Sequence, residues 1–534
     1  MPAPSAVTPA ANANLFVALR AAFPQDLAAC AVETDTGLCY SWNDLEQASA
    51  MVANLLQSLD LPADARIAVQ VDKSVEALVL YLATLRAGLV YLPLNTAYQS
   101  AEMAYFMADA QPAVVVCSGR NFGWVSKQAF LSGTAYVFTL NDDRTGTLLD
   151  RAAQFPRSHR VAQRQAGDVA AIIYTSGTTG RSKGAMLTHG NLLSNARMLQ
   201  SYWDWQGPQK TREQGGDVLI HALPIFHVHG LFVAIHGALI NGSKMLWLGQ
   251  FDPRVVLEKL PQATVFMGVP TLYVRLLAEP GLTPQAVRGM RLFISGSAPM
   301  LLDTFVQWQQ RTGHTILERY GMSETVMLTS NPCRAQDGER RGGTVGRPLP
   351  GVQLRVQDDA GHDLPAGEVG GIQVKGPGVF LGYWQMPEKT AQEFTADGFF
   401  KTGDVGLVDA QGYVTIVGRS KDLIISGGYN VYPAEIEGYI NAMPGVAESA
   451  VVGVADADFG EVGVAVVVAR PGAVLSEADI LARLKATLAN FKIPKRCAVV
   501  ADLPRNAMGK VQKNLLRAQY GAPGAPAAQG PTHA

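Results

Sequence analysis

The sequence predicts an α/β protein: a large N-terminal domain of parallel or mixed sheets covered by helices, followed by a small C-terminal α+β domain. Apolar strand-like runs alternate with amphipathic helical segments from residue 66 onward, a pattern typical of parallel sheets covered by helices. A Gly/Ser/Thr-rich loop follows one of these strands, whereas the C-terminal part carries neighbouring apolar strands and a capped helix. Because 534 residues exceed one ordinary core, we expect at least two domains.

The overall composition is that of a globular protein without a bulk charge. Hydrophobic residues make up 48% of the chain and charged residues 17%. Lysine and arginine number 44 against 45 acidic residues, so no overall field favours nucleic acid or an anionic membrane surface. We therefore expect no nucleic-acid partner, and ligands must be sought at local sites.

The cysteines and the N-terminal composition indicate a cytoplasmic protein. The five cysteines are scattered and form no CxxC motif, which suits a reducing compartment and argues against a metal framework. The first basic residue is Arg20, so neither a secretory nor an Arg-rich transit signal is recognisable. The apolar stretch 77–94 is interrupted by Arg86 and Gly88, so we expect no membrane span.

The first recognisable unit along the chain is a β-α-β arrangement. Residues 67–71 and 90–92 read as strands, and the helical segment between them places Leu78, Leu82 and Leu85 on one face. Sheets built from such units bind ligands at the carboxyl ends of their strands. Loops that follow the predicted strands are therefore the first places to look for a site.

A loop at residues 174–184 is the most informative of these stretches. It reads Tyr-Thr-Ser-Gly-Thr-Thr-Gly-Arg-Ser-Lys-Gly and stands between a strand at 169–173 and an amphipathic helix, which predicts a loop from strand to helix. Its glycines let backbone N–H groups approach an anion, its hydroxyls add donors, and Arg181 and Lys183 add positive charge. It is not a Walker A loop, because Lys183 is followed by Gly184. A merely flexible polar loop is the alternative; the length and order of the motif favour a phosphate cradle.

Three histidines occur together at residues 219–230, in a predicted strand and turn. A metal site is one interpretation of His221, His227 and His229. No Cys, Asp or Glu lies among them, and a single strand cannot wrap around a cation, so we disfavour a metal.

Two further turns carry small or polar residues. Residues 291–299 read as a strand that ends in Ser-Gly-Ser-Ala-Pro, which lacks the GxSxG spacing of a nucleophile elbow. Ser295 and Ser297 are therefore poor nucleophile candidates, and the small residues would instead admit a flat ring. Further along, Asp404 in a Thr-Gly-Asp turn can accept hydrogen bonds from both hydroxyls of a ribose.

The loop at 174–184 resembles the phosphate loop of the acyl-adenylating superfamily, which includes acyl-CoA synthetases, luciferases and the adenylation domains of peptide synthetases. The segment 318–325 (Glu-Arg-Tyr-Gly-Met-Ser-Glu-Thr) and the PxxxxGK motif at 504–510 also resemble that family, and the motifs occur in the family's order over nearly the whole chain. The resemblance implies that ATP with Mg²⁺ adenylates a carboxylic acid, and that coenzyme A then takes up the acyl group.

The resemblance also implies catalytic roles. His227 would be an aromatic gate at the acyl site, and His229 would line the wall of that site. Glu324 and Thr178 would hold Mg²⁺, and Lys510 would complete the site of adenylation. Such a preorganised charge beside the α-phosphate would stabilise the negative charge that develops during the transfer.

Nucleotide and coenzyme A contacts are implied at positions spread over the whole chain. Tyr320 would stack on the adenine, and Ser323 would contact the α-phosphate; the family usually has Thr there, but the hydroxyl is retained. The implied positions are Thr175, Ser176, Gly177, Thr178, Thr179, Gly180, Lys183, Ser297, Ala298, Tyr320, Gly321, Ser323, Asp404, Arg419, Lys421, Gly427 and Gly428.

The resemblance places the domain boundary at a hinge that contains Lys421. We expect an N-terminal domain at 1–418 that binds AMP and the acyl group, a hinge at 419–422, and a mobile C-terminal domain at 423–534. The Ala/Pro/Gly-rich tail after about residue 520 is expected to be disordered. Rotation about the hinge would exchange Lys510 for the loop at Gly427 and Gly428 between the two half-reactions.

Three strings, at 73–84, 221–225 and 292–299, resemble malonyl-CoA synthetases in particular. Malonate keeps a second carboxylate when the first one reacts. Burying that carboxylate without a cation would be costly, so an arginine is expected beside it.

Two arginines are the candidates for that role. Arg319 stands where many ligases of aromatic and fatty acids carry a glycine, so it would shorten the acyl site and charge it. Arg275 is the expected second fork, with His229 and Met327 completing the substrate site. Val228 replaces a threonine that is frequent in the relatives, which leaves methylmalonate open as a substrate.

Other functions remain open at this point. A medium- or long-chain fatty acyl-CoA synthetase would use the same motifs on a different acid. A stand-alone adenylation enzyme that loads a carrier protein is a further alternative. A catalytically inactive binding protein is the third, but such a protein would be expected to lack Lys510 or Glu324, and both are present.

Overall fold

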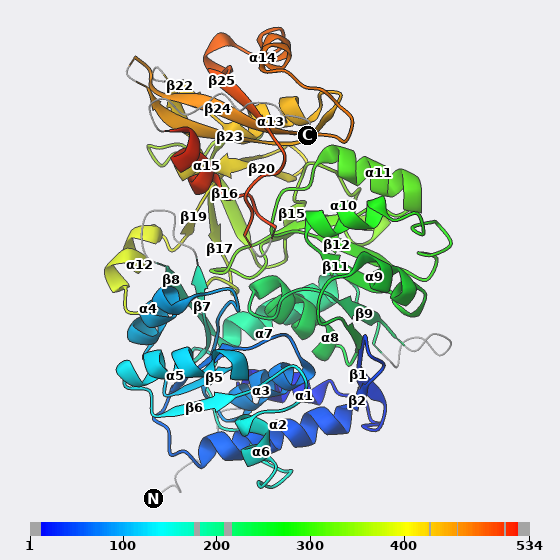
Figure 1. Cartoon of the computed structure of the whole chain (residues 1–534), viewed down its shortest axis with the longest axis vertical. Helices are drawn as coiled ribbons and strands as arrows, with labels where there is room; N and C mark the ends of the chain where they lie inside the picture. The colour runs from blue at the N-terminus through cyan, green and yellow to red at the C-terminus, as the bar shows by residue number, and fades with distance from the viewer. Residues whose placement is uncertain are drawn as a thin grey trace, which may run out of the picture.

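The structure is a computed structural model (Figure 1). It describes residues 12–175, 182–207, 216–426, 429–456, 458–506 and 509–521. Two large sheets and their helices fill the lower part of the view in Figure 1, and a smaller α+β domain lies at the end where the C-terminus is marked. The predicted fold class is confirmed: sheets covered by helices are followed by a small C-terminal domain.

The first large sheet has seven strands. Five neighbouring strands are parallel, as the β-α-β pattern predicts, and an antiparallel edge is added beside them. In spatial order the strands are β18 (Gly382–Tyr383), β8 (Lys183–Thr188), β7 (Val169–Thr175), β4 (Val90–Pro93), β3 (Arg66–Gln70), β5 (Val114–Cys117) and β6 (Tyr136–Thr139).

The Gly/Ser/Thr-rich loop connects two strands, β7 and β8, which corrects the prediction of a loop from strand to helix. The two strands pair antiparallel from Thr175 opposite Lys183 to Val169 opposite Thr188. Strand β8 also pairs with β18, so its backbone groups are satisfied on both sides inside the sheet. Helix α7 (His189–Tyr202) begins only after β8, with Thr188 and Asn191 forming a capping box.

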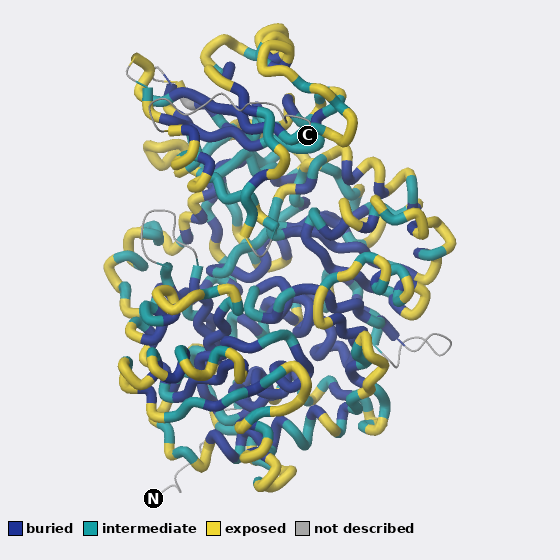
Figure 2. The backbone as a smooth tube through the Cα atoms, viewed as in Figure 1, coloured by how far each residue is buried: buried dark blue, intermediate teal, exposed yellow. Residues whose placement is uncertain are grey.

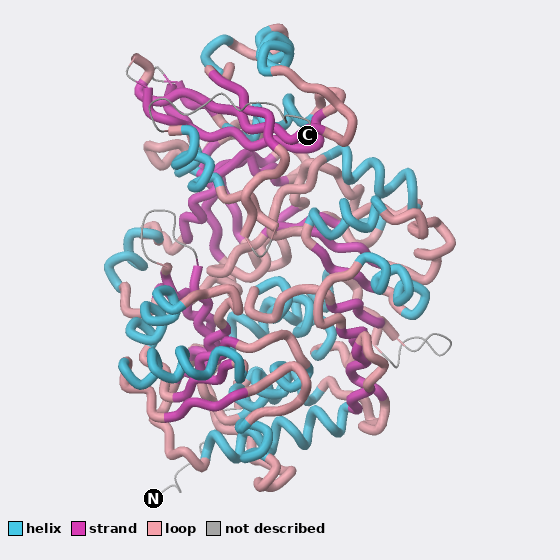
Figure 3. The backbone as a smooth tube through the Cα atoms, in the orientation of Figure 1, coloured by secondary structure: helices cyan, strands magenta, loops and turns pink. Residues whose placement is uncertain are grey.

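The second large sheet has nine strands and is parallel in its central part. Figure 3 shows the strands of both large sheets in the interior, with helices on the outside and between them. In spatial order the strands are β15 (Arg347–Pro348), β14 (Thr329–Ser330), β13 (Leu317–Tyr320), β12 (Leu292–Ser295), β11 (Val265–Gly268), β9 (Val218–His221), β10 (Lys244–Trp247), β1 (Cys30–Thr34) and β2 (Cys39–Ser41).

One hydrophobic core is shared by the two large sheets. Helix α3 (Val75–Arg86) belongs to it and is buried along its whole length, as expected for a helix that is apolar all round. Ser74 caps this helix by accepting a hydrogen bond from the backbone N–H of Ala77. A second core covers the other face of the seven-stranded sheet, under α4 (Ser100–Ala110) and α5 (Phe122–Leu131).

The remaining helices of the N-terminal part lie mainly on the surface, where Figure 2 shows exposed and half-buried backbone around the buried strands. Helix α10 (Pro270–Ala278) begins with Pro270, a position where the fixed φ and the missing N–H of a proline are tolerated. These helices are α1 (Leu15–Ala21), α2 (Trp42–Gln57), α6 (Thr147–Ala152), α9 (Pro253–Lys259), α10, α11 (Leu302–Thr312) and α12 (Pro387–Glu393). The short helix α8 (His236–Leu239) is instead fully buried.

A four-stranded antiparallel sheet follows the two large ones in the chain. Its strands are β16 (Gln353–Gln357), β17 (Gly370–Lys375), β19 (Phe400–Val408) and β20 (Val414–Arg419). The C-terminal sheet has the order β22 (Tyr429–Val431), β21 (Ile424–Ser426), β24 (Gly460–Ala469), β23 (Val446–Asp456), with β25 (Arg496–Val500) paired to β24. Its helices are α13 (Pro433–Asn441), α14 (Glu477–Lys485) and α15 (Lys513–Tyr520).

Two observations bear on the expected surroundings of the protein. Within the described ranges, no helix is both long enough and apolar enough to cross a membrane. Cys30 on β1 and Cys39 on β2 are joined by a disulfide, with their Cα atoms 6.0 Å apart. The scattered cysteines suggested a reducing compartment, in which a disulfide is not expected. The antiparallel pairing of β1 with β2 brings Cys30 and Cys39 together, and the spacing of cysteines in the sequence does not reveal this contact.

Candidate active site

A cluster of three polar residues, two half-buried around a buried aspartate, lies where β13, β19 and β20 meet. Tyr320 ends β13, and its hydroxyl donates a hydrogen bond to Asp404 Oδ2 at 2.5 Å. Arg419 at the end of β20 is opposite Asp404 in the strand pairing, and its Nε lies 2.9 Å from Asp404 Oδ1. Asp404 is only 3% exposed, so the arginine and the tyrosine together stabilise its charge. The structure thus brings Tyr320 to Asp404, which is 84 positions later in the chain, and adds Arg419 from the strand that follows.

The described ends of the Gly/Ser/Thr-rich loop lie beside Glu324. Thr175 and Lys183 face each other at the ends of β7 and β8. The Lys183 ammonium lies 4.3 Å from the ring centroid of Tyr383 on β18, and the Tyr383 hydroxyl donates to Glu324 Oε1 at 3.0 Å. Glu324 is 5% exposed, and burial raises its pKa above the ordinary value. The predicted positions Ser176, Gly177, Thr178, Thr179 and Gly180 lie outside the described residues.

A second group of buried polar side chains surrounds Arg319. Arg319 is 2% exposed and His229 is 1% exposed. Within the described part of the chain, Arg319 Nε and Nη2 and His229 Nε2 have no hydrogen-bond partner. His229 Nδ1 lies 3.2 Å from the hydroxyl of Ser297, which follows β12 with a positive φ of 70°. The fold therefore holds several polar nitrogens close together, and among the described residues these nitrogens have no hydrogen-bond partner.

Burial and neighbouring positive charges keep the histidines of this group neutral. Burial, followed by the positive charges of Arg319 and Lys510, lowers the pKa of His227 to about 4. Burial and Arg319 also hold the pKa of His229 well below its ordinary value. The backbone N–H of His229 donates to His227 Nδ1 at 3.4 Å, so that nitrogen is an acceptor. Arg319 is thus the main positive charge of the group, although burial lowers its own pKa to about 9.

Arg275 does not belong to this group, and the prediction that it forms a second fork beside Arg319 is wrong. Helix α10 buries Leu272, Tyr273 and Leu276 against the core, which turns Arg275 toward solvent as an exposed residue. Tyr273 is the residue of this helix that lies near Arg319. The arginine in the apolar segment extends into solvent because its helical phase places it there.

The other predicted positions fall in the same region. Met327 is 2% exposed, and its Cε lies 2.6 Å from the place that a Cβ on Gly321 would occupy. Ala298 follows Ser297 in the turn after β12, and Ser323 is half-buried directly before Glu324. Among the described residues, no group of three or more His, Cys, Asp and Glu side chains could hold a metal ion by itself.

Lys510 approaches this region from the C-terminal part of the chain. Its positive charge contributes to the lowered pKa of His227. The charges of Arg419 and Asp404 in turn shift the pKa of Lys510 in opposite directions. Burial by the surrounding atoms and the positive charge of Arg419 lower the pKa of Lys510, although the residue keeps an exposed surface. An ion pair of 2.7 Å between Arg470, at the end of β24, and Asp303 on α11 also links the two parts. Lys421 is exposed in a short 3-10 turn between β20 and β21.

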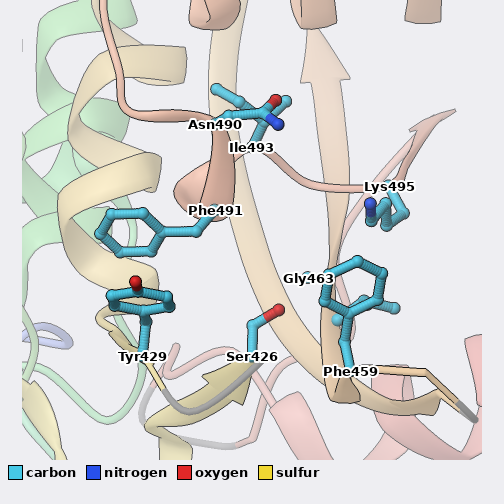
Figure 4. A pocket seen from close by; sticks show the side chains of 9 residues that line it. Ser426, Tyr429, Phe459, Gly463, Asn490, Phe491, Ile493 and Lys495 are labelled. Atoms are coloured by element: carbon cyan, nitrogen blue, oxygen red, sulfur yellow. The ribbon is translucent and has the colours of Figure 1, made fainter.

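A cavity of about 340 Å³ lies within the C-terminal domain (Figure 4). The rings of Tyr429 and Phe491 stack on one side with centroids 4.6 Å apart, and Lys495 Nζ lies 4.4 Å from the ring of Phe459 on the other. Ser426 and Tyr429 flank the predicted positions Gly427 and Gly428, which lie outside the described residues. Sequence reasoning missed this cavity, because its aromatic residues come from three separate segments.

Tyr383 and Glu318 are two further residues that sequence reasoning missed. Tyr383 sits in an ordinary Gly-Tyr-Trp string, and nothing in that string indicates contact with Glu324. Glu318 is 6% exposed, and burial raises its pKa to about 8. Glu318 directly precedes Arg319 in the motif, which was a signal for a role near the site. Successive side chains of a strand point to opposite faces, however, so Glu318 lies on the other face of β13 from Arg319.

Comparison with known families decides the assignment. A family model described as AMP-binding enzyme matches residues 19–384, and one described as AMP-binding enzyme C-terminal domain matches residues 435–510. The chain belongs to the AMP-binding enzyme family. Among curated relatives of this AMP-binding enzyme, the malonate–CoA ligase of Arabidopsis thaliana is 33% identical, covering 95% of this chain and 89% of the relative. The mitochondrial malonate–CoA ligase of Homo sapiens is 35% identical, covering 80% and 78%.

Solved structures of a MatB resemble this chain over nearly its whole length. The crystal structure of ATP-bound MatB from Rhodopseudomonas palustris is 53% identical, with a TM-score of 0.91 over 96% of this chain and 99% of that one. The apo structure of the same MatB has the same identity of 53% but a TM-score of 0.81. Over the same share of the chain, this AMP-binding enzyme is therefore more similar in structure to the ATP-bound form of that MatB than to its apo form.

Proposed function

We propose that this protein is an ATP-dependent ligase that joins malonate to coenzyme A through an acyl-adenylate and releases AMP and pyrophosphate. The observation that carries the proposal is the buried guanidinium of Arg319, whose Nε and Nη2 have no partner within the described chain. A buried charge without a partner is costly, and a carboxylate accepts both donors of a guanidinium fork. The names of the Arabidopsis and human relatives support malonate as the acid.

Malonate fits this site because it carries two carboxylates. One would lie against Arg319 and His229, and the other would react with ATP. A long apolar acid would leave Arg319 desolvated and unpaired, so the site disfavours the medium- and long-chain fatty acids that the sequence left open. Val228 is buried in this region, and methylmalonate remains a second acid to test.

The reaction needs two steps because a carboxylate has no good leaving group. In the first step a carboxylate oxygen of malonate attacks the α-phosphorus of ATP, and the bond to pyrophosphate breaks. Lys510 would stabilise the charge that develops there, and Asp404, with Tyr320 and Arg419, would hold the nucleoside. In the second step the thiol of coenzyme A attacks the acyl carbon, the bond to the AMP oxygen breaks, and the thiol proton passes to solvent.

The residues present fit a magnesium ion bound to ATP. Mg²⁺ is usually held by one or two carboxylates together with substrate phosphates and water, and Glu324 supplies one buried carboxylate at the described ends of the phosphate loop. Thr178 would be the second contact, and it lies outside the described residues. When bound, the ion would offset charge on the phosphates.

The second step is proposed to follow a rotation at the hinge 419–422. The greater likeness to the ATP-bound relative supports the arrangement before that rotation. The aromatic walls and Lys495 of the C-terminal cavity suit the adenine and the phosphates of coenzyme A. The domain limits at 418 and 423 and the cytoplasmic location stay predictions.

The test is pyrophosphate release by the purified protein with malonate, methylmalonate, butyrate and palmitate, each with and without coenzyme A. We expect malonate or methylmalonate to support release and thioester formation to require coenzyme A. Activity highest with palmitate would favour the fatty acid alternative. Acyl transfer to a carrier protein but not to coenzyme A would favour the loading enzyme, and no activity with any acid would overturn the proposal.

A further inference from the structure

Tyr383 lies between two groups of the proposed ATP site. Its hydroxyl donates to Glu324 Oε1 at 3.0 Å, and its ring lies under Lys183 with the ammonium 4.3 Å from the ring centroid. The side chain is buried, at 4% exposure. One side chain therefore contacts both an acid and a cation, which come from segments 141 positions apart (183 and 324).

The position of Tyr383 is fixed by its strand. Tyr383 pairs with Ala185 on β8, and its backbone N–H donates to Thr390 Oγ1 at 2.9 Å. Gly382 has a φ of 146°, and a Cβ there would lie 2.8 Å from Thr390 Cγ2, so the close approach of α12 requires a glycine. These contacts fix the backbone of Tyr383 independently of the Glu324 carboxylate.

Glu324 is tied to the same segment through its backbone. The N–H of Phe380 donates to the carbonyl oxygen of Glu324 at 2.8 Å, and the ring of Phe380 packs edge-on against Tyr383 with centroids 4.9 Å apart. The acid and its hydroxyl donor are thus connected by the short stretch 380–383. A rotation of the Glu324 carboxylate would break the hydrogen bond, because neither end can follow.

Fixing one carboxylate oxygen matters for a metal ligand. Outer partners of this kind orient the ligand, and their removal typically lowers metal affinity by roughly 10–100-fold. A lysine over an aromatic face is likewise restrained in position by the ring. Tyr383 is not itself placed to bind a metal as an anion, because its hydroxyl proton is engaged with Glu324.

We propose that Tyr383 is a positioning residue of the ATP site, which holds Glu324 Oε1 and leaves the other carboxylate oxygen for Mg²⁺ while its ring seats Lys183. The inference rests on the proposed function, because it takes Glu324 as the magnesium contact. It makes two separable statements: the hydroxyl acts on the metal, and the ring acts on the lysine.

Calorimetric titration of the full-length protein with ATP, in EDTA and in saturating Mg²⁺, tests the first statement. For Tyr383→Phe we expect the Kd for ATP in EDTA to stay unchanged, while the factor by which Mg²⁺ tightens ATP binding falls by about 10-fold or more. Tyr40→Phe is the matched control, because the Tyr40 hydroxyl donates to Glu76 at 2.5 Å elsewhere in the fold. That variant is expected to bind ATP like the wild type under both conditions.

Tyr383→Leu tests the second statement, since it removes the ring as well. We expect weaker ATP binding in EDTA for this variant only. If Tyr383→Phe keeps the full Mg²⁺ effect, or loses ATP binding equally with and without Mg²⁺, the positioning role is overturned. Failure of the wild type to use any acid, with the Mg²⁺ effect on ATP lost in Tyr383→Phe, would instead overturn the proposed function and leave this inference standing.

Discussion

The guanidinium of Arg319 lies directly against the backbone of Gly296. A Cβ built on Gly296 would lie 2.6 Å from Arg319 Cζ and from Nη1, closer than real Cβ contacts. The turn after β12 therefore leaves room for Arg319 only because residue 296 has no side chain. The small residues of this turn, interpreted from sequence as room for a flat ring, here make room for a cation.

Arg319→Ala should remove the partner of the second carboxylate of malonate. We expect kcat/KM for malonate to fall by about 10²-fold or more, within the roughly 2–5 kcal/mol cost of truncating a buried charge pair. Butyrate has no second charge, so its kcat/KM should stay the same or rise. Arg275→Ala is the control, because Arg275 is exposed and should leave both acids unaffected. Equal losses on malonate and butyrate would mean that Arg319 supports the fold or the nucleotide instead.

Gly296→Ala should displace Arg319 without changing its charge. We expect kcat/KM for malonate to fall by about 10-fold or more, since displacing a substrate-positioning group by about 1 Å can cost on the order of 10² in rate. Gly123→Ala on α5 is the control, because a Cβ there meets nothing within 4 Å. Steady-state kinetics with malonate and a thermal unfolding scan of each variant decide the outcome. An unchanged kcat/KM in Gly296→Ala would show that Arg319 can shift without cost.

Lys510→Ala should separate the two half-reactions. We expect ATP–pyrophosphate exchange with malonate to fall by about 10²–10³-fold, the usual cost of a preorganised charge at the reacting centre. Thioester formation from supplied malonyl-AMP should stay near the wild-type rate, because the lysine belongs to the first arrangement only. Lys485→Ala, on an exposed position of α14, is the control. Equal loss of both half-reactions would count against the rotation at the hinge.

Phe491→Ala and Lys495→Ala should raise the KM for coenzyme A. Stacking of a base on an aromatic side chain contributes roughly 1–3 kcal/mol, so we expect an increase of about 10-fold with Phe491→Ala. The exchange of pyrophosphate into ATP with malonate, which needs no coenzyme A, should not change. Phe130→Ala on α5 is a control at a ring that is 60% exposed. Unchanged KM values for coenzyme A would exclude the C-terminal cavity as its binding site.

Glu318→Gln should alter the pH dependence of stability. Burial raises the pKa of Glu318 to about 8 from an ordinary value of 4.5, so the folded protein holds a proton that the unfolded chain releases above pH 4.5. Stability from this group is therefore complete below the unfolded pKa and is lost as pH rises through about 8. The loss amounts to a few kcal/mol at most, at about 1.4 kcal/mol per pKa unit.

The measurement for Glu318 is thermal unfolding of both proteins between pH 5 and pH 9. We expect Glu318→Gln to become more stable relative to wild type as pH rises, and the gap to level off above about pH 8. Glu258→Gln, at an exposed position of α9, should follow the wild-type curve. Parallel curves for Glu318→Gln and wild type would show that the carboxyl is ionised at neutral pH in the folded state.

The sequence by itself determined the fold class, the family resemblance and the positions of several elements. Strand and helix periods identify buried faces locally, so the helix opened by Pro270 and the helix capped by Ser476 were predictable. The resemblance also indicated the acid, since Arg319 stands where many ligases of aromatic and fatty acids carry a glycine. What the motifs could not determine is which distant side chains come together.

Only the tertiary structure decided the partners of the site. Arg275 and Tyr273 are two residues apart, yet the phase of α10 turns one to solvent and the other toward Arg319. Tyr383 reaches Glu324 because β18 adds to the edge of a sheet in which its neighbour, β8, ends nearly 200 residues earlier in the chain. Sequence patterns report the environment along one segment, whereas contacts between segments depend on strand order and packing, which no local pattern encodes.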